Sequence, residues 1–184
     1  LADPLRPGDE RRFHPGEANV RMADIVIINK CDSARPEDIE AVEASVRELA
    51  PKATILRANS PVTVEDPSIV AGRDVVVIED GPTLTHGGMS FGAGVVGARA
   101  AGAASIVDPS PHAVGSIAET YEKYPNAVGI LPAMGYGDGQ IRDLEATIEE
   151  TPCDAVVSGT PTDIRRVLET TKPITRVRYA LEEL

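Results

Sequence analysis

The amino-acid sequence predicts an α/β fold with a mostly parallel sheet and helices on both faces. Short β-branched runs alternate along the chain with stretches of helical periodicity, a pattern typical of parallel strands joined by right-handed crossovers. Hydrophobic residues make up 42% of the 184 residues but aromatic residues only 3%. The core must therefore be built from Val, Ile, Leu and Ala, which suit parallel strands buried on both sides.

The elements follow in order along the chain. The first twenty residues are rich in Pro, Gly, Arg and Glu without periodicity, so we expect a loop or an arm there. Apolar residues recur at helical spacing in 36–49, where Pro36 stands in the first turn. Residues 74–79, with four consecutive β-branched residues, are the most strongly predicted strand. The predicted strands are 24–29, 54–57, 74–79, 105–107, 127–131, 155–157 and 175–179, and the predicted helices are 36–49, 93–101, 116–124, 140–149 and 163–168.

Charge and composition exclude several classes of partner. The chain has 18 basic and 29 acidic residues, a net charge of −11, and no basic run, so it is a poor candidate for binding nucleic acid. No apolar run approaches the length of a membrane span and no signal peptide is visible, so we expect a cytoplasmic protein without a membrane partner. Cys31 and Cys153 make neither a disulfide framework nor a zinc site, and we expect both to be reduced. The chain begins with Leu rather than Met, so we expect a piece of a longer polypeptide.

The first predicted strand ends in the motif Asn29-Lys30-Cys31-Asp32. Ligands of open parallel sheets bind beyond the carboxyl ends of the strands, and Asn-Lys-x-Asp at such an end is the base-recognition motif of GTP-binding proteins. The Asp32 carboxylate can accept hydrogen bonds from the N1–H and the exocyclic amine of guanine, while Lys30 would cover the ring and Asn29 would tie neighbouring loops together. The alternative is a polar turn. Residues 58–61, after the next strand, match a loop that touches the base through a backbone N–H, or form a plain turn.

The strand at 74–79 leads into a polar, glycine-rich stretch that ends at a predicted helix. Glycine lets the backbone approach a ligand closely and a helix N-terminus favours negative charge, so this stretch suits an anion. Glu79 and Asp80 are candidate Mg²⁺ ligands and catalytic carboxylates, and His86 is a candidate acid/base catalyst or phosphate donor. The alternative is a glycine-rich turn packed on a neighbouring helix and capped by the two acids. The predicted anion-binding residues here are Thr83, Thr85, His86, Gly87 and Gly88.

Arg165 and Arg166 stand in the predicted helix that follows a further strand end, where they could clamp a phosphate. The alternative is that Asp163 caps this helix and both arginines are solvated. The chain contains no Gly-x-x-x-x-Gly-Lys-Ser/Thr motif, the loop that cradles nucleotide phosphates. Either that loop lies upstream in a longer polypeptide, or the domain hydrolyses nothing.

Four segments of the chain carry a resemblance to a known family: RMADIVIINKCD at 21–32, VIEDGPTLTHGG at 77–88, LPAMGYG at 131–137 and TRVRY at 175–179. Through these segments the sequence resembles the archaeal cyclic 2,3-diphosphoglycerate synthetases and their bacterial relatives, which are described as predicted GTPases. The resemblance implies a P-loop-NTPase or Rossmann-like fold and a chain that is the C-terminal portion of a ligase. The implied reaction uses ATP and Mg²⁺ to close a phosphoanhydride within 2,3-diphosphoglycerate, whereas the Asn-Lys-x-Asp motif indicates GTP.

We therefore expect residues 1–72 to be the end of a nucleotide-binding domain without its phosphate loop, and 73–184 to be a C-terminal α/β domain with an anion-binding loop. The full-length protein would be a phosphoryl-transfer ligase, and this piece alone would be inactive. Alternatives are a GTPase of the regulatory or metallochaperone type and a non-catalytic anion-binding or oligomerisation domain. The expected cofactors are Mg²⁺ and ATP or GTP. The expected partners are a small organic phosphate and a second copy of the chain in a homo-oligomer such as a dimer.

Overall fold

The computed structural model describes residues 1–12, 14–81 and 90–184, which form two compact units. Unit 1 comprises Leu1–Pro61 with Tyr179–Leu184, and unit 2 comprises Val62–Arg178. Each combines helices with a sheet, which confirms the predicted α/β class, although parallel and antiparallel pairings both occur. The units divide between residues 61 and 62, ahead of the boundary that the sequence predicts after residue 72.

Unit 1 contains a small mixed sheet in the order β1-β2-β9. β1 and β2 pair in parallel, with Ile25 opposite Thr54, whereas β9 runs antiparallel to β2. Ala2 forms a parallel bridge with Ile28, so the start of the chain lies beside β1. The strands are β1 (Ile25–Ile28), β2 (Thr54–Asn59) and β9 (Glu182–Glu183).

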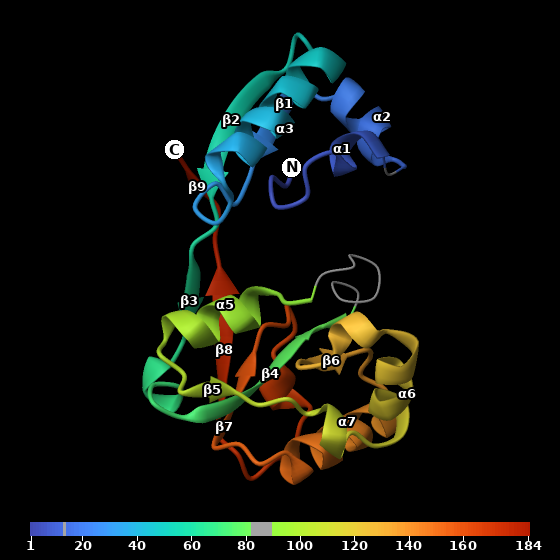
Figure 1. Ribbon diagram of the computed structural model, residues 1–184, viewed down its shortest axis with the longest axis vertical. Helices are drawn as coiled ribbons and strands as arrows, with labels where there is room; N and C mark the ends of the chain where they lie inside the picture. Colours follow the sequence, from blue (N-terminus) through green and yellow to red (C-terminus); the bar gives the residue numbers. More distant parts are fainter. Residues whose placement is uncertain (13, 82–89) are drawn as a thin grey trace. The chain divides into compact units, whose positions relative to one another are not determined.

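Helix α3 (Pro36–Leu49) lies along this sheet, and its bounds are those that the sequence predicts (Figure 1). Pro36 occupies the first turn, where its missing N–H costs nothing, and Pro51 follows closely after the last residue, where it prevents further helix. The apolar face of the helix packs against the sheet and closes the core of unit 1. The buried residues of this core are Ala2, Val20, Val26, Ile28, Ile39, Val42, Val46, Leu49 and Ala50.

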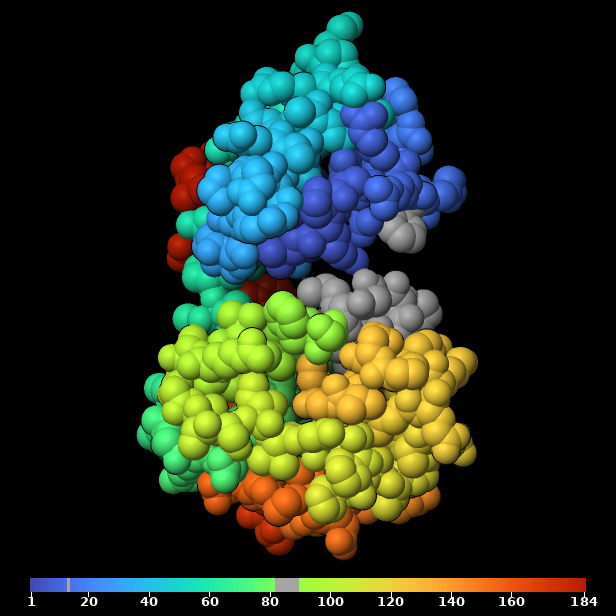
Figure 2. Space-filling model, in the orientation of Figure 1, coloured from blue at the N-terminus to red at the C-terminus, as the bar shows by residue number. Residues whose placement is uncertain are grey.

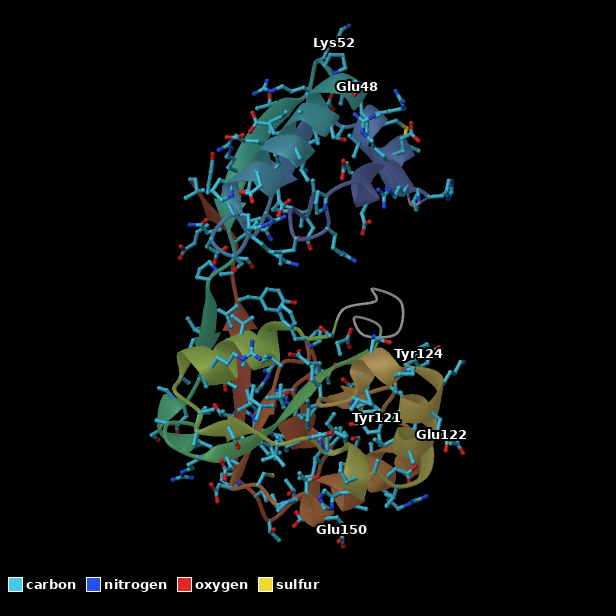
Figure 3. The ribbon with its side chains drawn as sticks, in the orientation of Figure 1. Glu48, Lys52, Tyr121, Glu122, Tyr124 and Glu150 are labelled. Atoms are coloured by element: carbon cyan, nitrogen blue, oxygen red, sulfur yellow. The ribbon has the colours of Figure 1, made fainter. Side chains whose placement is uncertain are left out.

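The described residues among the first twenty are folded, so the expectation of a loop or an arm is wrong. They contain α1 (Asp9–Arg12) and the start of α2 (Gly16–Arg21). The guanidinium of Arg11 anchors α1 to α3, because its Nε donates to Ser45 Oγ at 2.6 Å and its Nη2 pairs with Glu48, which is labelled in Figure 3. Because this anchor is polar and joins residues far apart in the sequence, α1 has no periodic apolar pattern from which a helix could be predicted.

Unit 2 contains a sheet in the order β3-β8-β7-β4-β5, with β6 also paired to β4. β4 has three partners in this sheet and pairs in parallel with β7 along one edge and with β5 and β6 along the other. The four residues Val75–Ile78 have no exposed surface, as expected of a parallel strand covered on both faces. The strands are β3 (Val62–Val64), β4 (Asp74–Asp80), β5 (Ser105–Ile106), β6 (Leu131–Ala133), β7 (Ala155–Ser158) and β8 (Ile174–Tyr179).

Three α-helices pack around this sheet within the described part of unit 2. α5 packs against β4 and β3, and its Gly97 lies so close to Val177 of β8 that a Cβ would come within 2.7 Å of the valine side chain. Figure 2 shows α5 and the segment that follows it in yellow-green and α6 in yellow on the visible face of this unit. The helices are α5 (Ala93–Ala100), α6 (Gly115–Lys123) and α7 (Asp138–Glu150), with 3-10 turns η1 (Pro67–Ile69), η2 (Ser110–His112), η3 (Pro125–Ala127) and η4 (Ile164–Arg166).

Two predicted elements of unit 2 are wrong in position or type. The strand expected at 127–131 begins only at Leu131, because the buried Tyr121 hydroxyl of α6, labelled in Figure 3, donates to the Ile130 carbonyl at 2.7 Å. That carbonyl is directed to α6 instead of a neighbouring strand. The helix expected at 163–168 is only the 3-10 turn η4. Strands β3 and β9 are absent from the sequence prediction because both are too short for a periodic signal.

No helix in the described ranges has the combination of length and apolarity that crossing a lipid bilayer requires. The two cysteines, Cys31 and Cys153, are free and partly buried.

Candidate functional site

The predicted base-recognition residues lie at the carboxyl end of β1, where the loop that follows is joined to the loop after β2. Asp32 Oδ1 accepts a hydrogen bond from the backbone N–H of Ser60 at 3.0 Å, and the Cys31 N–H donates to the Ala58 carbonyl at 3.0 Å. Parallel pairing of β1 and β2 brings these loops to the same edge of the sheet. The Asp32 carboxylate is thus held in place while its residue remains exposed.

Lys30 holds an unusual conformation in this loop. Its φ of 64° is in the left-handed region, which residues with a side chain rarely adopt. Its ammonium group pairs with Asp3 Oδ2 at 2.7 Å, which ties the loop to the chain segment that lies beside β1. Strained backbone that tertiary contacts maintain is found most often at functional sites.

Asn29 contributes a buried side-chain oxygen to the same loop. Its Oδ1 has no hydrogen-bond partner among the residues that the structure describes, although such atoms are normally satisfied. Sequence reasoning selected Asn29, Lys30 and Asp32 but missed Asp3, because it assigned the first twenty residues to a loop. Asp3 directly follows the apolar Ala2, as an acidic residue often follows the last apolar residue of a strand. This position is the signal that could have identified it.

Glu79 lies at the N-terminus of α5, the position that the sequence predicts for an anion. Its Oε1 accepts hydrogen bonds from the backbone N–H groups of Gly92 at 3.0 Å and Val95 at 2.9 Å, and only 2% of the residue is exposed. A Cβ at Gly92 or Gly159 would overlap the Glu79 carboxylate, so glycine is required at both positions. The helix dipole and the free N–H groups of α5 are therefore used by a carboxylate of the chain itself.

Burial raises the pKa of the Glu79 carboxyl above its ordinary value, and this effect outweighs the backbone N–H groups, of Val95 first, that lower it. Asp80 is the next residue of β4, and successive residues of a strand project to opposite faces of the sheet. The two carboxylates that the sequence assigns to one metal ion therefore do not converge. Within the described residues, no group of three or more His, Cys, Asp or Glu side chains is arranged to hold a metal.

Of the Glu79 and Asp80 carboxylates, Asp80 is the better candidate to hold Mg²⁺. It is half-buried at the carboxyl end of β4, and Mg²⁺ is commonly held by one or two carboxylates together with substrate phosphates. Glu79, in contrast, is engaged by the first turn of α5. The other residues predicted for the glycine-rich loop, Thr83, Thr85, His86, Gly87 and Gly88, lie outside the described residues.

The structure does not bring Arg165 and Arg166 together as a pair. Arg165 forms a two-point contact with Asp163, at 2.8 and 2.9 Å, and also pairs with Glu65 at 3.0 Å. Hydrogen bonding to the Arg165 guanidinium lowers the pKa of Asp163 to about 2. Glu65 in turn binds Arg178 of β8 at 2.6 Å, so this cluster links η4, β8 and the residues after β3. Arg166 is exposed and has no ion pair within the described part of the chain.

The fold and the site together define an α/β protein. In it, hydrogen bonds join the polar loop after β1 to the loop after β2, at the carboxyl ends of these two parallel strands. No protein-family model matches the chain. Among curated proteins the chain is similar to one that is named a synthetase and is therefore an enzyme. That protein is the arginine synthetase ArcE of Thermococcus kodakarensis, to which the chain is 54% identical over all 184 residues. The chain spans 41% of the length of this relative.

Proposed function

We propose that the chain is part of a nucleotide-dependent synthetase in which unit 1 binds the base of the nucleotide. The observation that supports this most directly is the joined pair of loops after β1 and β2, in which Asp32 is fixed by the Ser60 N–H beside a left-handed Lys30. In this arrangement Lys30 would cover one face of the base, and Asp32 would accept hydrogen bonds from its edge. The 54% identity to a synthetase throughout the chain supports an enzyme rather than an isolated binding domain.

For the product we favour arginine, because the similar protein carries the name arginine synthetase. Forming a guanidinium group from a ureido group requires the ureido oxygen to leave and a nitrogen nucleophile, ammonia or an amine, to form the new C–N bond. Transfer of a phosphoryl group from ATP to that oxygen allows it to depart as phosphate, and such transfer depends on positioning and charge stabilisation. The second candidate is the closure of a phosphoanhydride in 2,3-diphosphoglycerate, supported by the resemblance of residues 77–88 and 131–137.

Several finer assignments belong to the same proposal. The fold would be of the P-loop-NTPase or Rossmann type with helices on both faces of the sheet. Asp80 would contact Mg²⁺, which supplies charge neutralisation at the phosphates when bound. The residues 83–88 would bind the anionic substrate, with His86 as the acid/base group. The protein would act in the cytoplasm as a homo-oligomer, with a small molecule as its substrate partner.

The identity of the base decides between the synthetase and a GTPase. An Asn-Lys-x-Asp motif favours guanine, whereas the synthetase proposal calls for ATP. A GTPase of the regulatory or metallochaperone type would hydrolyse GTP without consuming a second substrate. A non-catalytic anion-binding domain would convert neither ATP nor GTP to products.

The test uses the full-length polypeptide that contains this chain. Calorimetric titration with Mg-ATP and with Mg-GTP measures the two affinities in the wild type and in Asp32→Ala. We expect Asp32→Ala to weaken binding of the preferred nucleotide about tenfold or more, because hydrogen bonds to a charged group contribute about 1.5–3 kcal/mol each. Asp24→Ala is the matched control, since this exposed aspartate lies at the opposite end of β1.

The products are then measured with the preferred nucleotide. Formation of arginine, followed by amino-acid analysis, supports the first candidate, and nucleotide consumption that depends on 2,3-diphosphoglycerate supports the second. Absence of binding of either nucleotide by the full-length protein would sink the synthetase proposal. Selective binding of GTP, with hydrolysis that needs no second substrate, would support the GTPase instead.

A further inference from the structure

The ammonium group of Lys30 is held by a carboxylate outside the base-recognition loop. Asp3 Oδ2 accepts from Lys30 Nζ at 2.7 Å, and the Asp3 and Lys30 side chains are 21% and 35% exposed. Arg6 Nη2 lies 3.8 Å from the same oxygen, beyond hydrogen-bond distance, so Lys30 is the closer cation. The Asp3 carboxylate therefore faces the loop while most of its surface is covered.

Backbone pairing fixes the position of Asp3 beside the loop. The preceding residue, Ala2, donates its N–H to the Ile27 carbonyl at 2.8 Å and accepts from the Asn29 N–H at 3.0 Å. Asp3 Oδ1 accepts from the Leu5 N–H at 3.0 Å, which closes a turn of the chain and sets the direction of the carboxylate. These bonds hold the other carboxylate oxygen towards the base-recognition loop.

Lys30 and Asp32 lie in one tight turn and carry opposite charges. The Lys30 carbonyl accepts from the N–H groups of Ser33 at 3.0 Å and Ala34 at 3.1 Å. Consecutive Cα atoms are about 3.8 Å apart, so the Cα atoms of Lys30 and Asp32 are separated by less than about 7.6 Å. A lysine side chain spans this distance, and an ammonium group without another partner would be attracted to the Asp32 carboxylate.

The Asp32 carboxylate is not paired with a cation. It forms no ion pair with any described residue, and the hydrogen bond from the Ser60 N–H engages its Oδ1. A nucleotide base needs this carboxylate as an acceptor, because its N–H groups would have to displace any ammonium group already bound there. The engagement of Lys30 by Asp3 therefore leaves Asp32 available to a base.

We propose that Asp3 is a positioning residue for nucleotide recognition, which holds the Lys30 ammonium group away from Asp32 and so keeps that carboxylate available to the edge of the base. The inference rests on the proposed function, in which Asp32 reads the base and the stem of Lys30 covers it. Asp3 acts only through Lys30. Because an ion pair of this exposure contributes little to stability, the effect of Asp3 is expected on nucleotide binding rather than on folding.

The test is calorimetric titration of the full-length protein with Mg-GTP and with Mg-ATP. Asp3→Asn keeps the shape and the Oδ1 acceptor but not the charge, and we expect it to weaken binding of the preferred nucleotide about tenfold. The double variant Asp3→Asn/Lys30→Met has no ammonium group that could occupy Asp32 and keeps an unbranched stem over the base. It is expected to bind at least about threefold more tightly than Asp3→Asn. Asp3→Glu restores a carboxylate and should recover most of the loss.

Asp9→Asn is the matched control. Asp9 Oδ2 lies 3.7 Å from Nε of Arg6, the arginine that also neighbours Asp3, but it forms no ion pair with Lys30 in the described part of the chain. This variant should leave both affinities within about twofold. Asp3→Ser, whose hydroxyl can still accept from the Leu5 N–H, replaces Asp3→Asn if that variant does not fold.

Unchanged nucleotide binding in Asp3→Asn would overturn the proposal. So would a double variant that binds no better than Asp3→Asn, since it would show that Asp3 only anchors the chain. Absence of binding of either nucleotide by the wild type would overturn the proposed function and this inference together. Binding that is lost in Asp32→Ala but retained in Asp3→Asn would contradict this inference alone.

Discussion

Replacing Glu79 removes the carboxylate that holds the first turn of α5. In Glu79→Ala the part-buried N–H of Gly92 and the buried N–H of Val95 lose their acceptor, and a fully buried donor left without one costs about 1–3 kcal/mol. Removal of a carboxylate that is costly to bury offsets part of this loss. We therefore expect the free energy of opening of α5 to fall by about 2–3 kcal/mol. Glu79→Gln retains one oxygen acceptor, and we expect it to lose about 1 kcal/mol or less.

Hydrogen exchange of the full-length protein, measured by mass spectrometry on peptides that cover 90–100, reports this opening directly. A loss of 2–3 kcal/mol corresponds to an exchange rate about 30- to 150-fold faster in Glu79→Ala. Glu122→Ala is the control, because Glu122 lies exposed on α6 (Figure 3). Unchanged protection of α5 in Glu79→Ala would refute the reasoning, since it would show that the carboxylate does not stabilise the helix start.

The pH dependence of stability in the wild type and in Glu79→Gln tests how burial of the Glu79 carboxyl affects its ionisation. Because the folded-state pKa of Glu79 is raised above the ordinary glutamate value of 4.5, its favourable contribution to stability is fully present below that value and is lost as the pH rises through the raised pKa. Glu79→Gln cannot ionise at this position. The stability of the wild type relative to Glu79→Gln should therefore decrease as the pH is raised from about 4.5. An increase would show that hydrogen bonding outweighs burial at this carboxyl.

Three further outcomes follow from single contacts. Tyr121→Phe leaves the Ile130 carbonyl without its buried donor and should lower the free energy of unfolding by about 1–2 kcal/mol in urea denaturation, with an unchanged m-value. Arg165 lowers the pKa of Asp163 from 3.8 to about 2, so this carboxylate stabilises the fold above pH 3.8 and loses its effect as the pH falls towards 2. Asp163→Asn should abolish that part of the acid transition in a thermal melt. Lys30→Gly should relieve a left-handed conformation by about 1 kcal/mol while weakening nucleotide binding, and a large drop in thermal stability would contradict the strain.

The sequence determined those elements whose signals are local. Helix α3 was predicted because Pro36 acts on its own first turn and the apolar residues that follow share one face. Strand β4 was predicted because four consecutive β-branched residues fit a strand covered on both sides. The motif Asn29-Lys30-Cys31-Asp32 was recognisable because its position directly after a strand is also a local property.

Only the tertiary structure decided where the polar groups at these strand ends find their partners. The sequence left open whether Glu79 joins the start of α5 in an anion site or caps a glycine-rich turn, and the fold places the carboxylate on that helix start. It also marked Arg165 as a free phosphate ligand, but Glu65, a hundred positions earlier, binds it. Such contacts join residues that are distant along the chain, and their geometry depends on how strands and helices pack. No periodicity or spacing encodes them, because the charge of a residue does not specify which opposite charge will lie beside it after folding.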